Sequence, residues 1–177
     1  RELLRTTDAV SQAQAVLGGS IVSGLRMLPG NWAGAHTCWG TENREAAVRF
    51  LPATHGNPRG ANVEVKIVDP SANPYFATAA ILGLALDGIE EAKALPPEVT
   101  IDPAALTVSE RTAAGVGLLS TDQAEIVAGL ANSVRMRAIL GDPAVDALVA
   151  VRRYEYEHYS ALDPEQLCDR FRMAWSV

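Results

Sequence analysis

The chain has 177 residues, of which 48% are hydrophobic, and it carries a formal net charge of −6. This length is enough to bury a substantial core, and the apolar content is too high for a disordered chain. No run predicts a membrane span, the N-terminus does not resemble a targeting peptide, and the acidic balance excludes a general nucleic-acid binder.

The cysteines and histidines predict neither a disulfide framework nor a metal site. Cys38 and Cys168 lie far apart and outside any Cys-x-x-Cys spacing. They are most simply explained as reduced thiols of a cytoplasmic protein, with a disulfide as the alternative. His36, His55 and His158 have no neighbours at metal-site spacing, so we expect none of them to bind a metal.

The first predicted element is a helix over residues 1–17, which Gly18-Gly19-Ser20 would end. Residues 21–28 predict either a strand or a loop. Pro29-Gly30 predicts a turn, and residues 34–39 predict a short strand.

The clearest pattern lies over residues 62–67, where apolar and polar side chains alternate as in a strand with one buried face. A short strand over residues 48–50 precedes it. If the two strands lie in one sheet, their polar faces form a floor that carries Arg49, Glu64 and Lys66. Guanidinium groups bind phosphate or carboxylate oxygens bidentately and a carboxylate binds a hard cation, so this floor suits an anionic substrate with a divalent metal.

Charge is distributed unevenly along the chain. Residues 26–66 have a net charge of +2, so the rest of the chain carries −8. The cations of this zone are Arg26, Arg44, Arg49, Arg59 and Lys66. A locally basic zone in an acidic protein fits a compact anion such as a nucleoside triphosphate, and chance clustering on a solvated face is the alternative.

Residues 53–60 predict a flexible loop between the two strands, with Gly, Pro and one arginine, Arg59. Such a loop suits a segment that closes on a nucleotide. A plain hairpin loop is the alternative interpretation.

The remainder of the chain is predicted to be helical. Asn73 caps a helix that begins at Pro74, and its apolar length to Ile89 predicts burial against the sheet. Residues 98–117 predict a surface connection. Three later helices are predicted. The first begins at a capping box of Ser120 and Gln123 and runs to Leu140, where Gly141 ends it. The second runs from Asp142-Pro143 to about Tyr159, and the third from Asp163-Pro164 to Trp175.

The charged residues Arg152, Arg153, Glu155 and Glu157 follow one another closely in the second of these helices. We expect them to form a solvated or inter-helix charged face rather than a catalytic group.

Several linked motifs resemble the catalytic domain of glutamine synthetase. They are Asn43-Arg44 with Arg49 five residues on, Val63-Glu64-Val65-Lys66, and Asp69-Pro70-Ser71-Ala72-Asn73-Pro74-Tyr75. Family members have "NR-x-A-x-x-R", "x-E-V-R" and "D-P-x-x-N-P-Y" in this order, and the branch with "W-A-G-A" and "W-G-x-E-N-R-E-A" is the most similar. The resemblance is close over residues 26–89 and looser over the helices.

The resemblance implies an α+β fold of the glutamine synthetase/guanido kinase type, with a mainly antiparallel sheet, truncated, and a C-terminal helical part. Sheet and active-site strands would occupy about residues 20–70, and the helical part residues 73–177. It also implies an ATP-dependent carboxylate–amine ligase that uses Mg²⁺ or Mn²⁺. Such an enzyme forms a γ-glutamyl amide from glutamate and ammonia or an organic amine through γ-glutamyl phosphate, in a dodecamer-like homo-oligomeric ring.

Five residues match family positions with known roles. Arg26 matches an arginine that binds glutamate, and Arg44 one that serves both the nucleotide phosphates and the substrate. Arg49 matches a catalytic, phosphate-binding arginine, and Arg59 lies where the family has a basic nucleotide-binding residue. Glu64 matches a glutamate of the second divalent-metal site.

Two departures from the family pattern bear on the substrate. Lys66 stands where an arginine usually binds the substrate α-carboxylate, which keeps the charge but loses the forked geometry. Trp32 stands where glutamine synthetases place a flap glutamate that binds ammonium and accepts its proton. An indole cannot transfer that proton but can cover an organic amine, so the sequence favours a larger amine.

The chain lacks the family's small N-terminal β-domain and its upstream carboxylates, and the connection near residues 17–20 is shortened. We therefore expect the C-terminal part of a larger catalytic domain, inactive alone. One alternative is a non-catalytic glutamine-synthetase-like module for assembly or signalling. A weaker alternative is a guanidino-kinase-like phosphotransferase.

Overall fold

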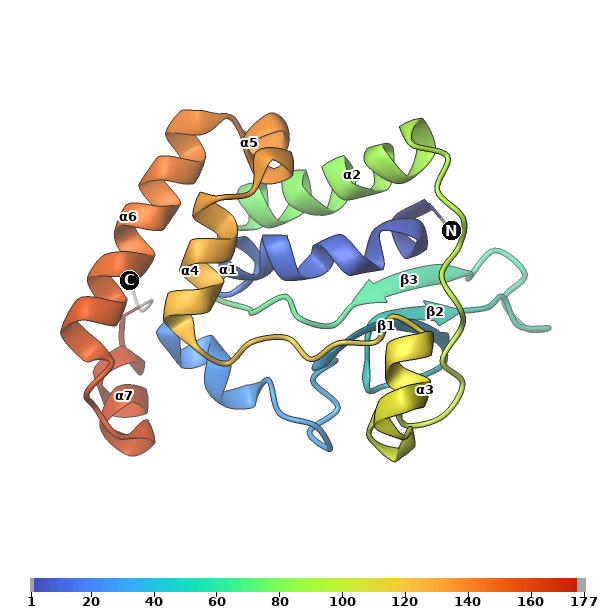
Figure 1. Ribbon diagram of the computed structural model, residues 1–177, viewed down its shortest axis with the longest axis horizontal. Helices are drawn as coiled ribbons and strands as arrows, with labels where there is room; N and C mark the ends of the chain where they lie inside the picture. Colours follow the sequence, from blue (N-terminus) through green and yellow to red (C-terminus); the bar gives the residue numbers. More distant parts are fainter. Residues whose placement is uncertain (1, 175–177) are drawn as a thin grey trace. The chain divides into compact units, whose positions relative to one another are not determined.

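The computed structural model describes residues 2–174 as two compact units, each made of three stretches of chain. The first unit contains residues up to 11, 27–67 and 81–119, and the second contains residues 12–26, 68–80 and those from 120 onward. Figure 1 labels the α-helices and strands of both units.

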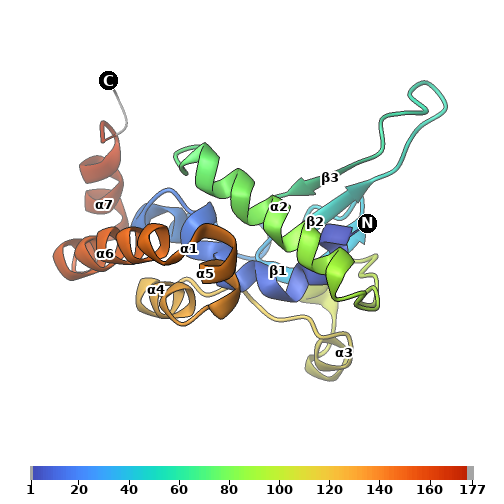
Figure 2. The same cartoon turned by 90° about the horizontal axis from the view of Figure 1, so that it is seen from above.

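The first unit is built on a three-stranded sheet in the order β1-β2-β3, formed by β1 (His36–Thr41), β2 (Ala46–Leu51) and β3 (Asn62–Val65). The pair β2 and β3 is antiparallel, and the pair β1 and β2 is parallel. Figure 2 shows the loop between β2 and β3 reaching away from this sheet. The predicted α+β class is confirmed, although one of the two strand pairings is parallel.

The parallel pairing requires an unusual connection, because parallel neighbours are normally joined by a dozen or more residues. Residues 42–45 alone join β1 to β2, and Thr41 lies opposite Phe50 while His36 lies opposite Ala46. Residues 42–45, which we call the return segment, are turned rather than extended: Glu42 has a φ of 54°, residues 44 and 45 also lie in a turn, and Asn43 packs against Gly40.

Helices and loops complete the first unit: part of the 3-10 helix η1 (Glu2–Ala13), the second half of α2 (Pro74–Glu90), η3 (Pro103–Ala105) and α3 (Val108–Ala113). The hydroxyl of Thr6 donates to the backbone oxygen of Leu84 at 2.9 Å, which ties η1 to α2. Cys38, Ala46, Val99 and Val116 form a buried cluster. Burial raises the pKa of the Cys38 thiol to about 12.

The second unit is helical, with α1 (Gln14–Leu17), η2 (Ile21–Arg26), α4 (Gln123–Ala131), α5 (Val134–Leu140), α6 (Asp142–Tyr159) and α7 (Pro164–Phe171). Its fully buried side chains include Leu17, Leu130, Met136 and Val145. Cys168 is exposed on α7, and both cysteines are free, as predicted. None of the described helices is both long and apolar enough to cross a membrane.

Some predicted elements are confirmed. Asn73 caps α2 as expected, because its side-chain oxygen accepts from the N–H groups of Tyr75 and Phe76. The alternating segment forms β3, although the strand ends at Val65.

Other predicted elements are wrong. Residues 21–26 form a 3-10 helix rather than the predicted strand or loop. The N-terminal segment is helical to Leu17 and ends before Gly18 as predicted, but most of it is 3-10 rather than α-helix. The predicted connection over residues 98–117 contains α3, whose capping box joins Thr107 and Glu110. The last helix ends at Phe171, whereas Trp175 lies outside the described residues.

The single helix predicted over residues 120–140 is two helices. Asp122, rather than Ser120, caps α4, and the chain turns at Asn132 before Ser133 caps α5. A C-capping Asn next to an N-capping Ser ends one helix and starts the next without an intervening loop.

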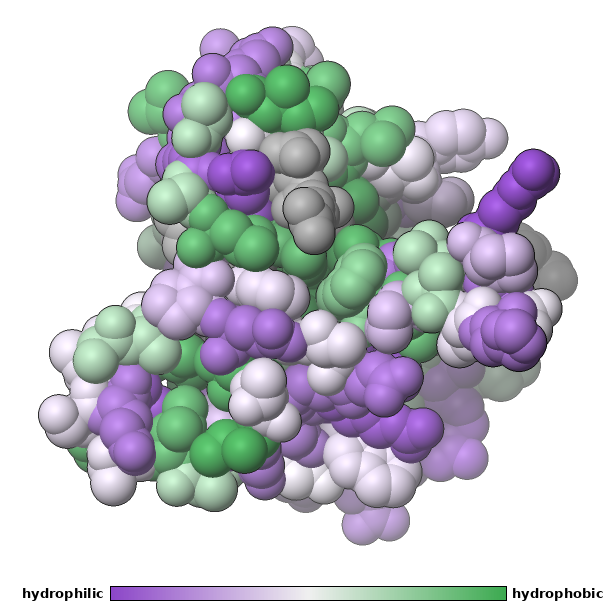
Figure 3. All heavy atoms as spheres, turned by 90° about the vertical axis from the view of Figure 1, so that its right-hand side faces the viewer, coloured by the Kyte–Doolittle hydropathy of each residue, from purple (hydrophilic) through white to green (hydrophobic). Residues whose placement is uncertain are grey.

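The predicted burial of α2 holds for one face only. Ala77, Ala80 and Leu84 are buried, whereas Leu82 and Leu86 are more than half exposed. Figure 3 shows hydrophobic side chains at the surface on one side of the molecule. The apolar run therefore predicted the helix but overstated how much of it the described chain covers.

Candidate functional site

The expected floor of charged side chains exists on β2 and β3. Arg49 lies opposite Glu64 in the antiparallel register, so the two side chains share one face. Arg49 Nη1 lies 3.2 Å from Glu64 Oε2, and Lys66 Nζ lies 3.5 Å from Glu64 Oε1. The structure thus brings three of the predicted site residues together.

The floor has one excess positive charge in a partly buried setting. The side chains of Arg49 and Lys66 are 18% and 12% exposed, whereas that of Glu64 is 42% exposed. Such half-buried cations interact more strongly with an anion than fully solvated ones, because water screens them less. Arg49 Nε is also buried without a hydrogen-bond partner among the described residues. The arrangement suits the binding of phosphate or carboxylate groups.

Arg44 and Trp32 form a second group in the same unit. The guanidinium carbon of Arg44 lies 5.2 Å from the centre of the Trp32 ring, within cation–π range. Trp32 has a φ of 52° and its side chain remains 63% exposed. A left-handed backbone at a bulky residue is uncommon and marks a constrained turn. This turn displays the indole to solvent with a cation on its ring.

Arg59 lies on the loop between β2 and β3, in a run of exposed residues. The backbones of Thr54 and Asn57 bond to each other, which folds the loop back on itself. Among the described residues, Arg59 makes no hydrogen bond or ion pair. The structure therefore does not bring Arg59 to the floor, and its nucleotide-binding role stays a prediction.

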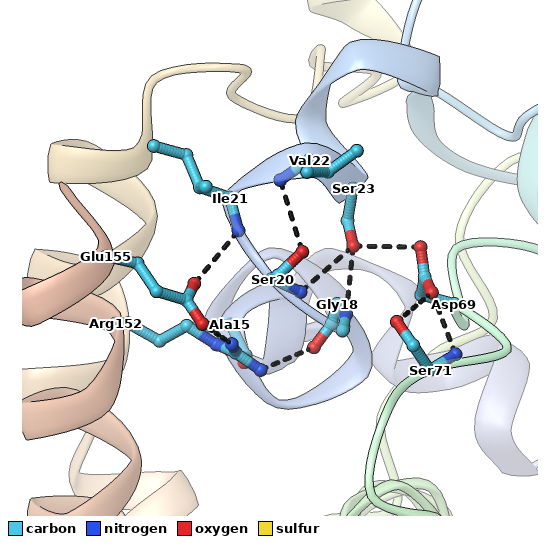
Figure 4. Close-up of polar contacts among 11 residues, drawn as sticks. Ala15, Gly18, Ser20, Ile21, Val22, Ser23, Asp69, Ser71, Arg152 and Glu155 are labelled. Carbon is cyan, nitrogen blue, oxygen red and sulfur yellow. Dashed lines mark hydrogen bonds and ion pairs between the residues drawn. The ribbon is translucent and has the colours of Figure 1, made fainter. Parts of the chain in front are cut away.

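Arg26 lies in the second unit, at the end of η2. Its Nη2 donates to the backbone oxygen of Val68 at 3.0 Å, and its Nε lies 3.8 Å from the carboxylate of Asp69. Asp69 also accepts hydrogen bonds from Ser23 and Ser71, as Figure 4 shows. Burial works to raise the pKa of Asp69, but these hydrogen bonds and the Arg26 charge outweigh it and lower the pKa. The contacts of Arg26 are thus structural, and its substrate-binding role stays a prediction.

The residues of this chain do not fit a complete divalent-metal site. Among the side chains that the structure describes, no group of three His, Cys, Asp or Glu residues is placed to hold a metal ion. Glu64 is one carboxylate already paired with two cations. Mg²⁺ and Mn²⁺ need several oxygen ligands. If Glu64 binds a metal, the other ligands must come from outside the described residues.

Sequence reasoning missed two residues that build the turn around Trp32. Glu45 is only 7% exposed and accepts hydrogen bonds from the backbone N–H groups of Gly30 and Trp32. Asn43 donates to the backbone oxygens of Val99 and Ile101. Both residues flank Arg44 in the sequence, and nothing in the local pattern indicates that their partners lie in residues 30–32 and 99–101.

The chain has an α+β fold whose small sheet carries the basic floor. The model of the glutamine synthetase catalytic domain matches residues 7–168. The chain belongs to this family, which consists of carboxylate–amine ligases.

Curated relatives agree with this assignment. Over 159 residues the chain is 40% identical to the gamma-glutamylpolyamine synthetase GlnA3 of Streptomyces coelicolor, a match that covers 89% of the chain and 34% of that protein. Over 145 residues it is 33% identical to the glutamine synthetase of Archaeoglobus fulgidus, covering 82% of the chain and 29% of that protein. The chain thus spans about a third of the length of these relatives.

Solved structures share the fold. A crystal structure described as a novel glutamine synthase homolog matches with a TM-score of 0.76 and 25% identity, covering 98% of this chain and 38% of that one. A complex of GmaS with ADP matches with a TM-score of 0.71 over 96% of this chain and 38% of that one. Its identity of 22% makes it an argument for the fold alone.

Proposed function

We propose that this chain forms part of an ATP-dependent ligase that joins the γ-carboxylate of glutamate to an organic amine. The observation that carries the proposal is the floor of Arg49, Glu64 and Lys66, whose side chains meet on one face of the sheet. Two anions, ATP and glutamate, must approach each other in such a reaction. Fixed cations offset their repulsion and stabilise the phosphoryl group during transfer.

The proposed reaction has two steps. An oxygen of the γ-carboxylate attacks the γ-phosphorus of ATP, which gives γ-glutamyl phosphate and ADP. The amine nitrogen then attacks the acyl carbon, phosphate leaves with the carbon–oxygen electron pair, and the nitrogen loses a proton. In this proposal, Arg49 and Arg44 hold the phosphate oxygens, while Lys66 holds glutamate. Arg59 would close on the nucleotide.

The amine is proposed to be larger than ammonia because of Trp32. The exposed indole cannot accept a proton, but its ring face attracts organic cations. The 40% identical relative is a gamma-glutamylpolyamine synthetase, which supports an organic diamine or polyamine here. ATP, a divalent ion and a homo-oligomeric ring belong to the same proposal, with the missing metal ligands supplied from outside this chain.

The experiment measures ADP release by the full-length protein with ATP, glutamate and Mg²⁺. Ammonia, monoamines, diamines and polyamines are compared at equal concentrations. We expect release to require both glutamate and an amine, and to be faster with an organic amine than with ammonia. Product mass should show one γ-glutamyl group per amine.

Three outcomes would contradict the proposal. Nucleotide binding without turnover would indicate a non-catalytic module for assembly or signalling. Phosphate transfer to a guanidino compound would indicate a phosphotransferase. Faster turnover with ammonia than with any organic amine would overturn the role given to Trp32 while leaving the ligase intact.

A further inference from the structure

The carboxylate of Glu45 is buried, yet the proposed chemistry does not use it. Its two oxygens accept from two nearby backbone N–H groups, that of Trp32 at 2.9 Å and that of Gly30 at 3.3 Å. Among the described residues it has no ion-pair partner within 4 Å. Burying a carboxylate is unfavourable unless hydrogen bonds compensate it, so the two backbone donors define what this group binds.

The segment that Glu45 binds is a constrained turn. The N–H of Asn31 bonds to the backbone oxygen of Leu28, and Gly30, Trp32 and Gly34 all have positive φ values, of 83°, 52° and 73°. The left-handed region suits glycine but strains a tryptophan. The hydrogen bond from the Trp32 N–H to Glu45 helps to hold that strained conformation in place.

Glu45 is itself held in position by the return segment. Its N–H donates to the side-chain oxygen of Asn43 at 3.0 Å, and Asn43 donates to the backbone of residues 99 and 101. The neighbouring Arg44 places its guanidinium over the Trp32 ring. Consecutive residues of one anchored segment thus fix the indole, Arg44 through the ring and Glu45 through the backbone.

We propose that Glu45 is a positioning residue that fixes Trp32 for the substrate amine. This inference rests on the proposed function, because it assigns Trp32 to the amine. Glu45 does not touch the substrate; it limits the conformations of the turn so that the exposed indole meets the amine in one orientation. Loss of the clamp would weaken amine binding and leave the nucleotide and glutamate sites unchanged.

The test compares Glu45→Gln with the wild type in the full-length protein. The amide keeps the size of the side chain but opposes one backbone N–H with its own NH₂ group. We expect the KM for the amine to rise roughly tenfold, as for the loss of one charged hydrogen bond, with KM for ATP and glutamate and the kcat within about twofold. Glu42→Gln is the matched control, because Glu42 is exposed in the same return segment.

A double-mutant comparison separates positioning from general damage. In a Trp32→Ala background, Glu45→Gln should raise the amine KM no further, because Glu45 acts through Trp32. Iodide quenching of tryptophan fluorescence is measured with and without Trp32→Phe, and the difference isolates the signal of Trp32. This signal should be quenched more strongly in Glu45→Gln than in the wild type, because the indole becomes more exposed. This second readout needs no turnover.

The outcomes distinguish this inference from the proposed function. Absence of amine-dependent turnover in the wild type counts against the proposed function, and the quenching measurement then tests the clamp alone. Wild-type turnover with an unchanged amine KM in Glu45→Gln overturns the inference only. Unchanged quenching, additive effects in the Trp32→Ala background, or a Glu45→Gln protein that fails to fold would also overturn it.

Discussion

Arg49 and Glu64 face each other across β2 and β3, and their ion pair contributes little to stability. Glu64 is 42% exposed, so water screens the ion pair, and its contribution to stability is about 0–1 kcal/mol. The same guanidinium placed against a transferring phosphoryl group is worth far more, because it acts on charge that develops in the transition state.

Arg49→Ala should therefore separate activity from stability. We expect kcat to fall by about 10²–10³-fold. The midpoint of thermal unfolding should change by only a few degrees, since a screened ion pair is lost. ADP release and calorimetry on the full-length protein measure the two effects, and Arg153→Ala, an exposed arginine on α6, is the control. An equal loss of stability and activity would make Arg49 a structural residue.

His36 gives the protein a stability that depends on pH. The ring is 2% exposed, and its Nδ1 has no hydrogen-bond partner among the described residues. Burial lowers its pKa below the ordinary 6.5, against the opposing charges of Asp102 and Glu45. The unfolded chain then binds a proton that the folded chain does not, so folding weakens as the pH falls below 6.5.

The free energy of unfolding of the wild type should thus decrease between pH 7 and pH 5.5 more steeply than that of His36→Gln, which cannot titrate. Denaturant titrations at several pH values measure both slopes. His55→Gln, which removes an exposed loop histidine, is the control and should retain the wild-type slope contributed by His36. Identical slopes for the wild type and His36→Gln would contradict the assignment.

At the scale of elements, α6 is fixed by a buried ion pair rather than by apolar contacts alone. Arg152 Nη1 donates to Glu155 at 2.8 Å and Nη2 donates to the backbone oxygen of Gly18 at 2.9 Å. Glu155 accepts from the N–H of Ile21 at 3.0 Å (Figure 4). Burial raises the pKa of Glu155, with the Arg152 charge opposing. The pair links α6 to the ends of α1 and η2.

Arg152→Ala should destabilise the protein by about 3–5 kcal/mol, because it leaves a buried carboxylate and backbone acceptors without their partner. The neighbouring Arg153→Ala, on the exposed face of the same helix, should stay within about 0.5 kcal/mol. Urea unfolding measures both. A similar small effect for the two variants would show that water reaches Glu155 and replaces the arginine.

The same elements show what the sequence could predict. Alternation over residues 62–67 predicted β3, and its polar face predicted the meeting of Glu64 with Arg49. Local chemistry also predicted the Asn73 cap. The strand and the cap depend on neighbours in the chain, which the sequence displays directly. The Arg49–Glu64 pair follows from the alternation once the two strands are placed in one sheet.

Features that depend on distant contacts were not predictable in this way. The parallel pairing of β1 and β2 and the clamp of Glu45 on Trp32 both depend on the path of the return segment, which the periodicity does not encode. Arg152 and Glu155 were assigned to a charged face that could be solvated, and their burial became visible only with residues 15–21 packed against α6.

At the scale of the whole molecule, the described residues do not provide every group that the proposed reaction needs. The chain covers about a third of its curated relatives, and its floor has two cations but one carboxylate. We propose that this chain binds phosphate and glutamate, positions the amine and contributes Glu64 to a metal site whose other ligands lie outside the described residues.

In the proposed ligase, the γ-carboxylate of glutamate is phosphorylated before the amine attacks it. Glutamate labelled with ¹⁸O in its γ-carboxylate tests this directly in the full-length protein with ATP and an organic amine. We expect each phosphate released to carry one ¹⁸O atom from glutamate. Unlabelled phosphate, released together with a γ-glutamyl amide or without one, would contradict it.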